Sequence, residues 1–293
     1  MPLALRVDGG MDDEFHRRVL RLHGFDQGLQ RGILAVGKPR RNGLGRAKRM
    51  PVCYNADRHS FQEATMNCAA VLKELEAMGT AQHRKVYARH GVAPPLFGVS
   101  YKNQGLLAKK LKCNHALACE LWDSGNHDAR VLATMVADPA QIDARLAERW
   151  VKDLGNYVLC DAFAKLIART AVAEAKAQKW LASKKEWIGR AGWTIVAHLA
   201  GSDGAMDDAE LLALLPQIEA RIHTAPNRVR DAMNMALISI GVRNAKLRRA
   251  ALASAKRIGK VEVDHGATGC KTPDAADYIA KTVAYRQRKA AAR

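Results

Sequence analysis

From about residue 60 onward, the chain is a succession of helical patterns that Gly, Pro, Asn or Asp break after every ten to twenty residues. Within each pattern, apolar residues recur at the spacing of an amphipathic helix. Runs of β-branched residues that alternate with polar ones are rare, and aromatic residues make up only 5% of the chain. The sequence therefore predicts an all-α protein. We expect its helices over 60–78, 81–90, 99–112, 114–124, 127–137, 139–154, 156–169, 173–183, 186–200, 207–223, 227–241, 244–258 and 274–288.

Several of these helix ends carry explicit signals. Gly79 is placed to end one helix and Thr80 to cap the next, because a Thr side chain can accept a hydrogen bond from a free backbone amide. Pro139 stands at the first position of a helix, where its missing N–H is not needed. Gly241 and Gly259 are predicted to follow directly after helix ends.

The helices follow one another in short pairs with a period of about 35–45 residues, which is typical of HEAT or armadillo repeats. We therefore predict a right-handed α-solenoid of HEAT-like repeats over residues 59–289, with a concave basic face. The repeats lack crisp self-similarity, so an ordinary globular helical domain is the alternative. Residues 1–58 are punctuated by glycines and carry a run of cations at 37–49, which predicts a disordered basic N-terminal extension.

Positive charge is in large excess over negative charge. Lys and Arg number 47 against 29 Asp and Glu, which gives a formal net charge of +18. The tails contribute to this surplus, but it continues inside the helical region, for example at Lys109, Lys110 and Lys112. Such a chain is expected to bind a polyanion, with nucleic acid as the first candidate and an acidic membrane surface as the second.

Features that mark export or membrane insertion are missing from the sequence. No apolar run is long enough for a transmembrane helix, and the N-terminus does not resemble a secretory signal. The six cysteines show no CxxC pairing, and Cys160 lies on an apolar helix face, as a reduced core thiol would. These features predict a cytoplasmic protein.

The helix expected over 156–169 contains a carboxylate, Asp161, inside its apolar stripe. Asp is a poor residue for a helix interior, and burial of its charge without a partner is strongly unfavourable. Two interpretations are open. Asp161 can pair with Lys165 one turn along, at the edge of the stripe, or it can line a concave surface and meet positive charge on a ligand.

Arg190 is the matching anomaly in the next long apolar helix, 186–200. A guanidinium in that position can clamp a backbone phosphate. It can equally form a salt bridge with Asp161 or Glu186, and the sequence does not decide between these roles.

Aromatic and polar residues near these two charges are candidates for contacts to a nucleic acid. All five tryptophans lie in the middle of the chain, among them Trp150 and Trp193. Tryptophan is most often a core residue, but beside positive charge it can also stack on bases or pack against sugars. Arg230 and Asn234 share a helix with Arg228 and can contact phosphate or bases. The alternative is a solvated helix face in which Asn234 supports a neighbouring loop.

Motifs for other chemistry are absent from the sequence. The chain has no P-loop, GxGxxG, GxSxG or HExxH pattern, so nucleotide hydrolysis, hydride transfer and serine or zinc hydrolysis have no support. Asp264, His265 and Cys270 lie close together, but their spacing matches no zinc pattern. We therefore expect neither a metal site nor a cofactor.

Three segments together resemble a known family. They are LLAKKLKCNHALACELWDSGNHDARVLATMVADP at 106–139, the Asp161 helix with its successor that carries Arg190, and MNMALISIGVRN followed by VDHGATGCKTPDAADYI. Over roughly 66–285, the chain resembles the DNA alkylation repair glycosylases built from HEAT-like repeats, the AlkD superfamily. It is most similar to a bacterial branch that ends in the DHG…CKTPDA element.

This resemblance implies a protein that wraps duplex DNA in a basic groove and releases N3- or N7-alkylated purines without drawing the base into a pocket. It implies that Asp161 stabilises an oxocarbenium-like sugar and orients water, and that Arg190 binds phosphate. The family packs two tryptophans on the sugar and backbone around the lesion, and at those places this chain has Tyr157 and Met235. Tyr157 still offers an aromatic face one turn from Asp161. Met235 does not, which leaves Trp150 or Trp193 to fill the same space.

The first hypothesis from the sequence is thus a DNA glycosylase with Asp161 as electrostatic catalyst. Its DNA contacts would come from Tyr157, Arg190, Trp150, Trp193, Arg230, Asn234 and Met235. We expect a bacterial cytoplasmic monomer, associated with the nucleoid when it binds double-stranded DNA that carries alkylated bases, without a membrane or nucleotide cofactor as partner. The alternative is a non-catalytic helical-repeat protein that binds nucleic acid or a protein partner. A third hypothesis makes Lys165 the amine of a Schiff-base lyase.

Overall fold

The structure is a computed structural model that describes residues 66–201 and 206–292. The extension predicted to be disordered, 1–58, lies outside the described residues, and so does the start of the helix predicted at 60–78. The division of the chain into an extension and a repeat domain therefore stays a prediction.

Every regular element in the described part of the chain is helical, which confirms the all-α prediction. The elements are α2 (Cys68–Met78), α3 (Ala81–Arg89), α4 (Tyr101–Leu111), α5 (His115–Asp123), α6 (His127–Val136), η3 (Pro139–Gln141), α7 (Ala144–Trp150), η4 (Val151–Asp153), α8 (Tyr157–Ile167), α9 (Ala173–Leu181), α10 (Glu186–Gly201), α11 (Asp208–Arg221), α12 (Asn227–Arg243), α13 (Ala245–Ile258) and α14 (Ala275–Ala291). The labels η3 and η4 denote short 3₁₀ helices.

Local signals placed most helix ends correctly. Gly79 caps the end of α2, and the Thr80 hydroxyl accepts a hydrogen bond from the His83 amide at the start of α3. The helix predicted over 139–154 is wrong, because the chain there forms η3, α7 and η4 in succession. The break arises at Asp143, whose carboxylate accepts a hydrogen bond from the Leu146 amide and so begins a new helix.

Gly241 was expected to end a helix, and this prediction is also wrong. It lies inside α12, which continues to Arg243. A Cβ atom at Gly241 would come within 2.5 Å of the Ile279 side chain on α14 and 3.0 Å of the Ala251 side chain on α13. The glycine therefore permits close helix packing. Gly259, by contrast, follows α13 with a φ of 69°, as predicted for a residue after a helix end.

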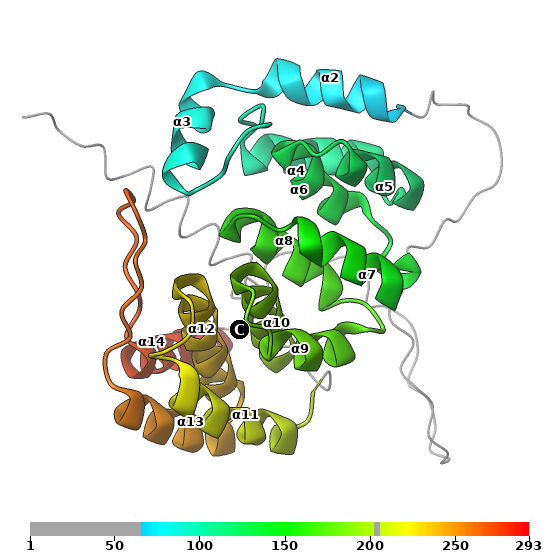
Figure 1. Ribbon diagram of the computed structural model, residues 1–293. Coiled ribbons are helices and arrows are strands. Elements are labelled where there is room, and N and C mark those ends of the chain that lie inside the picture. Colours follow the sequence, from blue (N-terminus) through cyan, green and yellow to red (C-terminus); the bar gives the residue numbers. More distant parts are fainter. Residues whose placement is uncertain (1–65, 202–205, 293) are drawn as a thin grey trace, which may run out of the picture.

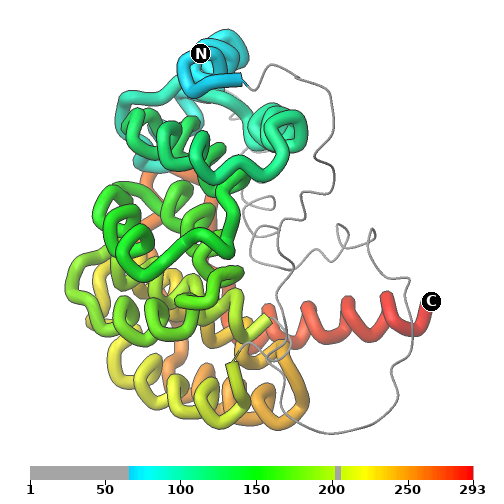
Figure 2. The backbone as a smooth tube through the Cα atoms, turned by 90° about the vertical axis from the view of Figure 1, so that its right-hand side faces the viewer, coloured from blue at the N-terminus to red at the C-terminus, as the bar shows by residue number. Residues whose placement is uncertain are grey.

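The helices stack in successive layers along the long direction of the molecule (Figures 1 and 2). α6, α8, α10 and α12 pack against one another in that order and form a central column. A second set covers this column, with α5 against α6, α9 against α10, and α13 against both α11 and α12. This arrangement gives each inner helix of the central column a neighbour from the preceding layer and one from the next.

A buried carboxylate organises the connection between α3 and α4. Asp128, in the first turn of α6, is fully buried and accepts backbone hydrogen bonds from Phe97 at 2.7 Å, Gly98 at 2.9 Å and Val99 at 2.9 Å. The negative charge lies near the positive end of the α6 dipole and pairs with three donors of the loop. The loop is thereby held against the column.

Glu219 links α11 to α13. Its ionisation is expected to make the free energy of unfolding depend on pH in the acidic range. It accepts hydrogen bonds from Arg257 at 2.6 and 2.7 Å and from Ser254 at 2.6 Å, and the Arg257 guanidinium, followed by the Ser254 hydroxyl, lowers the pKa of Glu219 to about 2. A carboxylate whose pKa falls on folding stabilises the protein above its unfolded pKa, and that contribution is lost as the pH falls through the folded value. We expect Glu219 to lose its contribution between about pH 4.5 and about pH 2.

Urea unfolding measured at about pH 5 and about pH 3 checks this expectation. Glu219→Gln should have a lower free energy of unfolding than the wild type at the higher pH. Its free energy of unfolding should also fall less than that of the wild type when the pH is lowered. Glu76→Gln removes an exposed carboxylate on α2 and is the matched control, with a pH dependence like that of the wild type. An unchanged pH dependence in Glu219→Gln would contradict the assignment.

Candidate functional site

Asp161 lies in the middle of α8, which begins after Asn156. The Asn156 side chain accepts a hydrogen bond from the Leu159 amide and so fixes the start of the helix. Lys165 is the one exposed residue of α8, whereas Asp161 is only 3% exposed. The carboxylate is thus buried within the column and needs a partner there.

That partner is Arg190 on α10. The Arg190 Nε atom lies 3.0 Å from Asp161 Oδ1, and Nη2 lies 2.9 Å from Oδ1 and 3.0 Å from Oδ2. The third nitrogen, Nη1, donates to Asp231 Oδ2 at 2.8 Å and to the carbonyl oxygen of Arg228 at 3.0 Å, both on α12. All three guanidinium nitrogens therefore have partners within the protein. Arg190 is itself only 3% exposed.

This geometry realises the salt-bridge alternative for Arg190. Asp161 pairs with Arg190 of the next layer and not with Lys165, the partner that one interpretation of the sequence gave it. In this arrangement the Arg190 guanidinium faces two carboxylates and does not face solvent, so the structure provides no place for a phosphate on it. The phosphate-clamp role implied by the resemblance does not fit these contacts.

Two carboxylates share one guanidinium in this group, which we call the ion cluster: Asp161, Arg190 and Asp231. Burial raises the pKa of Asp231, but the adjacent Arg190 outweighs that effect and lowers it below its usual range. Burial lowers the pKa of Arg190, but Asp161 and then Asp231 raise it above its usual value. With all three groups ionised, the ion cluster carries one net negative charge inside a strongly cationic chain.

Tyr157 covers the ion cluster from one helical turn before Asp161. Its ring centre lies 5.4 Å from the Arg190 guanidinium carbon and 4.8 Å from that of Arg228. The hydroxyl forms a hydrogen bond with Nδ1 of His90, the residue that caps α3. Burial raises the pKa of Tyr157, so the phenol stays neutral. Tyr157 is 8% exposed, and its ring packs against the guanidinium groups of Arg190 and Arg228.

Arg228 is the cation of this site that reaches solvent. It is half-buried, its backbone amide donates to Glu186 at 2.7 Å, and its guanidinium lies 3.4 Å from Nδ1 of His265. The sequence pointed to this helix but not to His90 or Asp231 as parts of the site. No local pattern marks them, because His90 ends a helix far from α8 in the chain and Asp231 looks like an ordinary polar residue of an amphipathic helix.

The structure does not bring the tryptophans or Met235 to this site. Trp150 is fully buried and stacks on Trp122 with ring centres 4.2 Å apart. Trp193 is also fully buried, within α10, and Met235 is buried in α12. These residues belong to the core, as the alternative interpretation of the tryptophans held, and none of them presents a face to a ligand here.

Arg230 and Asn234 support a loop. The Arg230 guanidinium donates to the carbonyl oxygens of Glu262 at 2.6 Å and Ala225 at 3.3 Å. Asn234 is fully buried and its side-chain amide donates to the carbonyl oxygen of Pro273 at 2.9 Å. This matches the supporting role weighed for Asn234 from the sequence.

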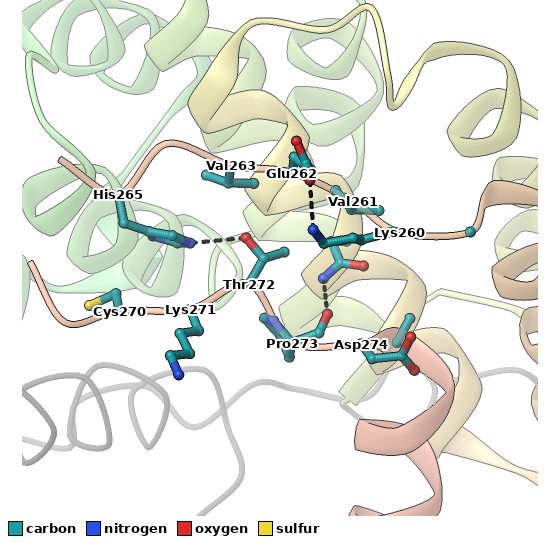
Figure 3. Close-up of a pocket in the computed structure, with 13 residues that line it drawn as sticks. Lys260, Val261, Glu262, Val263, His265, Cys270, Lys271, Thr272, Pro273 and Asp274 are labelled. Atoms are coloured by element: carbon teal, nitrogen blue, oxygen red, sulfur yellow. Dashed lines mark hydrogen bonds and ion pairs between the residues drawn. The ribbon is translucent and has the colours of Figure 1, made fainter.

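The loop itself, residues 259–274, encloses a pocket of about 500 Å³ against α12 and the start of α14 (Figure 3). His265 and Thr272 both line this pocket and form a hydrogen bond with each other, with 3.0 Å between Nε2 and Oγ1. In the described part of the chain, no three His, Cys, Asp or Glu side chains are grouped so that they could hold a metal ion. Within the same residues, no helix has the length and apolar character required to cross a membrane.

Comparisons with known proteins identify what this architecture is similar to. A family described as DNA alkylation repair enzyme matches residues 71–279. The proteins Lin0241 of Listeria innocua and Lmo0209 of Listeria monocytogenes are each 29% identical to the chain over 215 residues, which cover 71% of this chain and 93% of theirs.

A solved structure is also similar, with a TM-score of 0.70 and 32% sequence identity over 75% of this chain and 95% of that one. It is described as a new family of proteins related to the HEAT-like repeat DNA glycosylases with affinity for branched DNA structures. The prediction of HEAT-like helical repeats is thereby confirmed.

Proposed function

The chain belongs to the DNA alkylation repair enzyme family, and from this membership we propose that it is a DNA N-glycosylase that releases N3- and N7-alkylated purines from duplex DNA. The observation that carries the proposal is the ion cluster. Two carboxylates, the buried Asp161 and the half-buried Asp231, share the Arg190 guanidinium, and this group carries one net negative charge when all three are ionised. Tyr157 lies one helical turn before Asp161.

The chemistry of base release suits such a charge. Cleavage of an N-glycosidic bond builds positive charge on the deoxyribose, and a fixed negative charge in a low-dielectric environment stabilises that charge more than it stabilises the ground state. An alkylated purine is already cationic and leaves readily, so no strong general acid is required. This fits the neutral phenol of Tyr157, whose pKa is raised by burial.

We propose that Asp161 acts through its electric field, because only 3% of its surface is exposed. At a separation of roughly 7 Å and an effective dielectric constant of about 20, one unit charge contributes about 2 kcal/mol. Tyr157 would pack against the sugar or backbone near the lesion. Arg228, half-buried beside Tyr157, takes the phosphate-binding role in place of Arg190.

The direct test is release of free purine bases from methylated duplex DNA, separated and quantified by chromatography. We expect N3-methyladenine and N7-methylguanine to appear faster with the protein than by spontaneous loss, and unmethylated duplex of the same sequence to yield no bases. Release no faster than the spontaneous rate would exclude the glycosylase.

A second candidate function is DNA binding without base release. Two observations favour it: both Asp161 oxygens already accept hydrogen bonds from Arg190, and the similar solved structure is described as having affinity for branched DNA structures. Tighter binding to a four-way junction than to a linear duplex, with no free base from methylated DNA, would support this candidate over the glycosylase.

A further inference from the structure

The last helix, α14, is supported over only half of its length. Ala275 and Ile279 are buried and pack it against α12 and α13. Further along the helix, Arg286 contacts the body through its Nη1, which lies 3.5 Å from the carbonyl oxygen of Val242. From residue 284 to residue 292 every residue is exposed. Figure 2 shows this end of α14 extending away from the stacked helices.

The two faces of α14 differ in chemistry. Ala275, Ile279 and Arg286 share the face that contacts the body, because each lies within about 40° of the others at 100° per residue. A second stripe, at positions i, i+4, i+7 and i+8, carries Lys281, Tyr285, Arg288 and Lys289. Lys281 and Arg288 lie opposite the face that contacts the body, and Lys289 lies at the edge of the stripe, in the part of the helix where every residue is exposed.

All four side chains of this stripe, which we call the basic arm, are exposed, with Tyr285 at 54%. Asp277 is the one acidic residue within α14, and it lies one turn before Lys281. The rest of the helix from Lys281 onward is rich in Ala, Arg, Gln and Lys, which are good helix formers, and cations near a helix C-terminus interact favourably with its dipole. The arm can therefore stay helical without packing against the body.

We propose that the basic arm binds the phosphate backbone of DNA, outside the segment that lies at Tyr157 and Arg228. Lys and Arg contact phosphates by charge, and the Tyr hydroxyl is a recurrent phosphate donor. An amphipathic helix that inserts into a membrane surface needs an apolar face, and the exposed end of α14 offers little beyond Ala and Tyr285. Charge complementarity to DNA is thus the interaction that this surface fits.

The inference rests on the proposed function only in taking DNA as the partner, and its readout is binding rather than base release. The test compares the wild type with a triple variant, Lys281→Gln, Arg288→Gln and Lys289→Gln, by fluorescence anisotropy with a duplex at a series of salt concentrations. The matched control removes three exposed cations from α2, α7 and η4, through Lys73→Gln, Arg145→Gln and Lys152→Gln. Circular dichroism confirms that each variant keeps its helix content.

Each phosphate contact contributes about 0.9 to the slope of log affinity against log salt concentration. For the triple variant of the basic arm, which we call the arm variant, we expect the magnitude of that slope to be smaller than that of the wild type by about 2–3. For the control variant we expect it to be smaller by less than about 1. Equal slopes in the two variants would overturn the proposal. So would an arm variant that keeps its DNA slope but loses binding to vesicles rich in phosphatidylserine, because the arm would then face a membrane.

A wild type that binds no DNA would overturn both the proposed role of the basic arm and the proposed function. DNA binding without base release would overturn only the proposed glycosylase activity.

Discussion

Replacing Asp161 by Asn is expected to lower the rate of alkylpurine release by roughly 30-fold, the factor that corresponds to a loss of about 2 kcal/mol of transition-state stabilisation. The variant leaves Arg190 and Asp231 as a pair without net charge, so the cation that forms on the sugar loses its stabilisation. DNA affinity should stay the same or rise, because a negative charge near the phosphates is lost. Single-turnover base release with excess protein measures the chemical step apart from binding.

The control for this variant must separate catalysis from folding. The amide that Asp161→Asn introduces would keep only part of the hydrogen bonding to Arg190, so thermal unfolding of the variant has to be measured alongside its activity. Asp208→Asn removes a carboxylate that pairs with Arg243 at 3.1 Å, away from the ion cluster, and should release bases at the wild-type rate. If folded Asp161→Asn protein releases bases as fast as the wild type, Asp161 has no role in the reaction.

Replacing Arg190 by Met is expected to lower the free energy of unfolding by about 3–5 kcal/mol, the cost typical of removing one partner from a buried ion pair. The substitution keeps much of the side-chain volume but leaves the buried Asp161 and the half-buried Asp231 without their cation. Urea unfolding followed by circular dichroism measures the loss. Because unpaired buried carboxylates take up protons, the deficit should shrink as the pH falls towards their unfolded pKa.

The matched control is Arg149→Met, which breaks an exposed pair with Asp123 at 3.5 Å and should change stability by less than about 1 kcal/mol. Arg190→Met combined with Asp161→Asn and Asp231→Asn should recover part of the lost stability, because no uncompensated charge remains. If Arg190→Met alone is as stable as the wild type, the ion cluster does not hold the column together.

Much of the fold could be predicted because helix starts and ends are local. Thr80 and Asn156 cap helices through contacts a few residues away, and the apolar spacing sets which face turns inward. The prediction failed where contacts with residues distant in the sequence determine the structure. Gly241 looks like a helix end in sequence, but its role is set by Ile279 on another helix, and the sequence has no local sign of that contact.

For the candidate site, too, some residues could be predicted from the sequence, but the contacts between them could not. Asp161 and Arg190 could be singled out because a charge within an apolar helix needs a partner, wherever that partner lies. The partner itself follows from the packing of α8, α10 and α12, which joins residues 29 and 41 positions apart in the chain. Trp150 shows the limit of composition as a guide, because an aromatic residue near a site in sequence can still point into the core.

The contacts of Arg190 have a mechanical consequence. In a stack of repeats, each repeat contacts only its neighbours, so the stack bends most easily where adjacent layers can slide past each other. Arg190 is fastened to the layer before it through Asp161 and to the layer after it through Asp231 and the carbonyl oxygen of Arg228. Sliding at this level would break charged hydrogen bonds on both sides. We therefore expect the molecule to be stiffest at its centre. If it binds duplex DNA as we propose, the DNA would bend to match the protein at this level, and the outer repeats would adjust to the DNA.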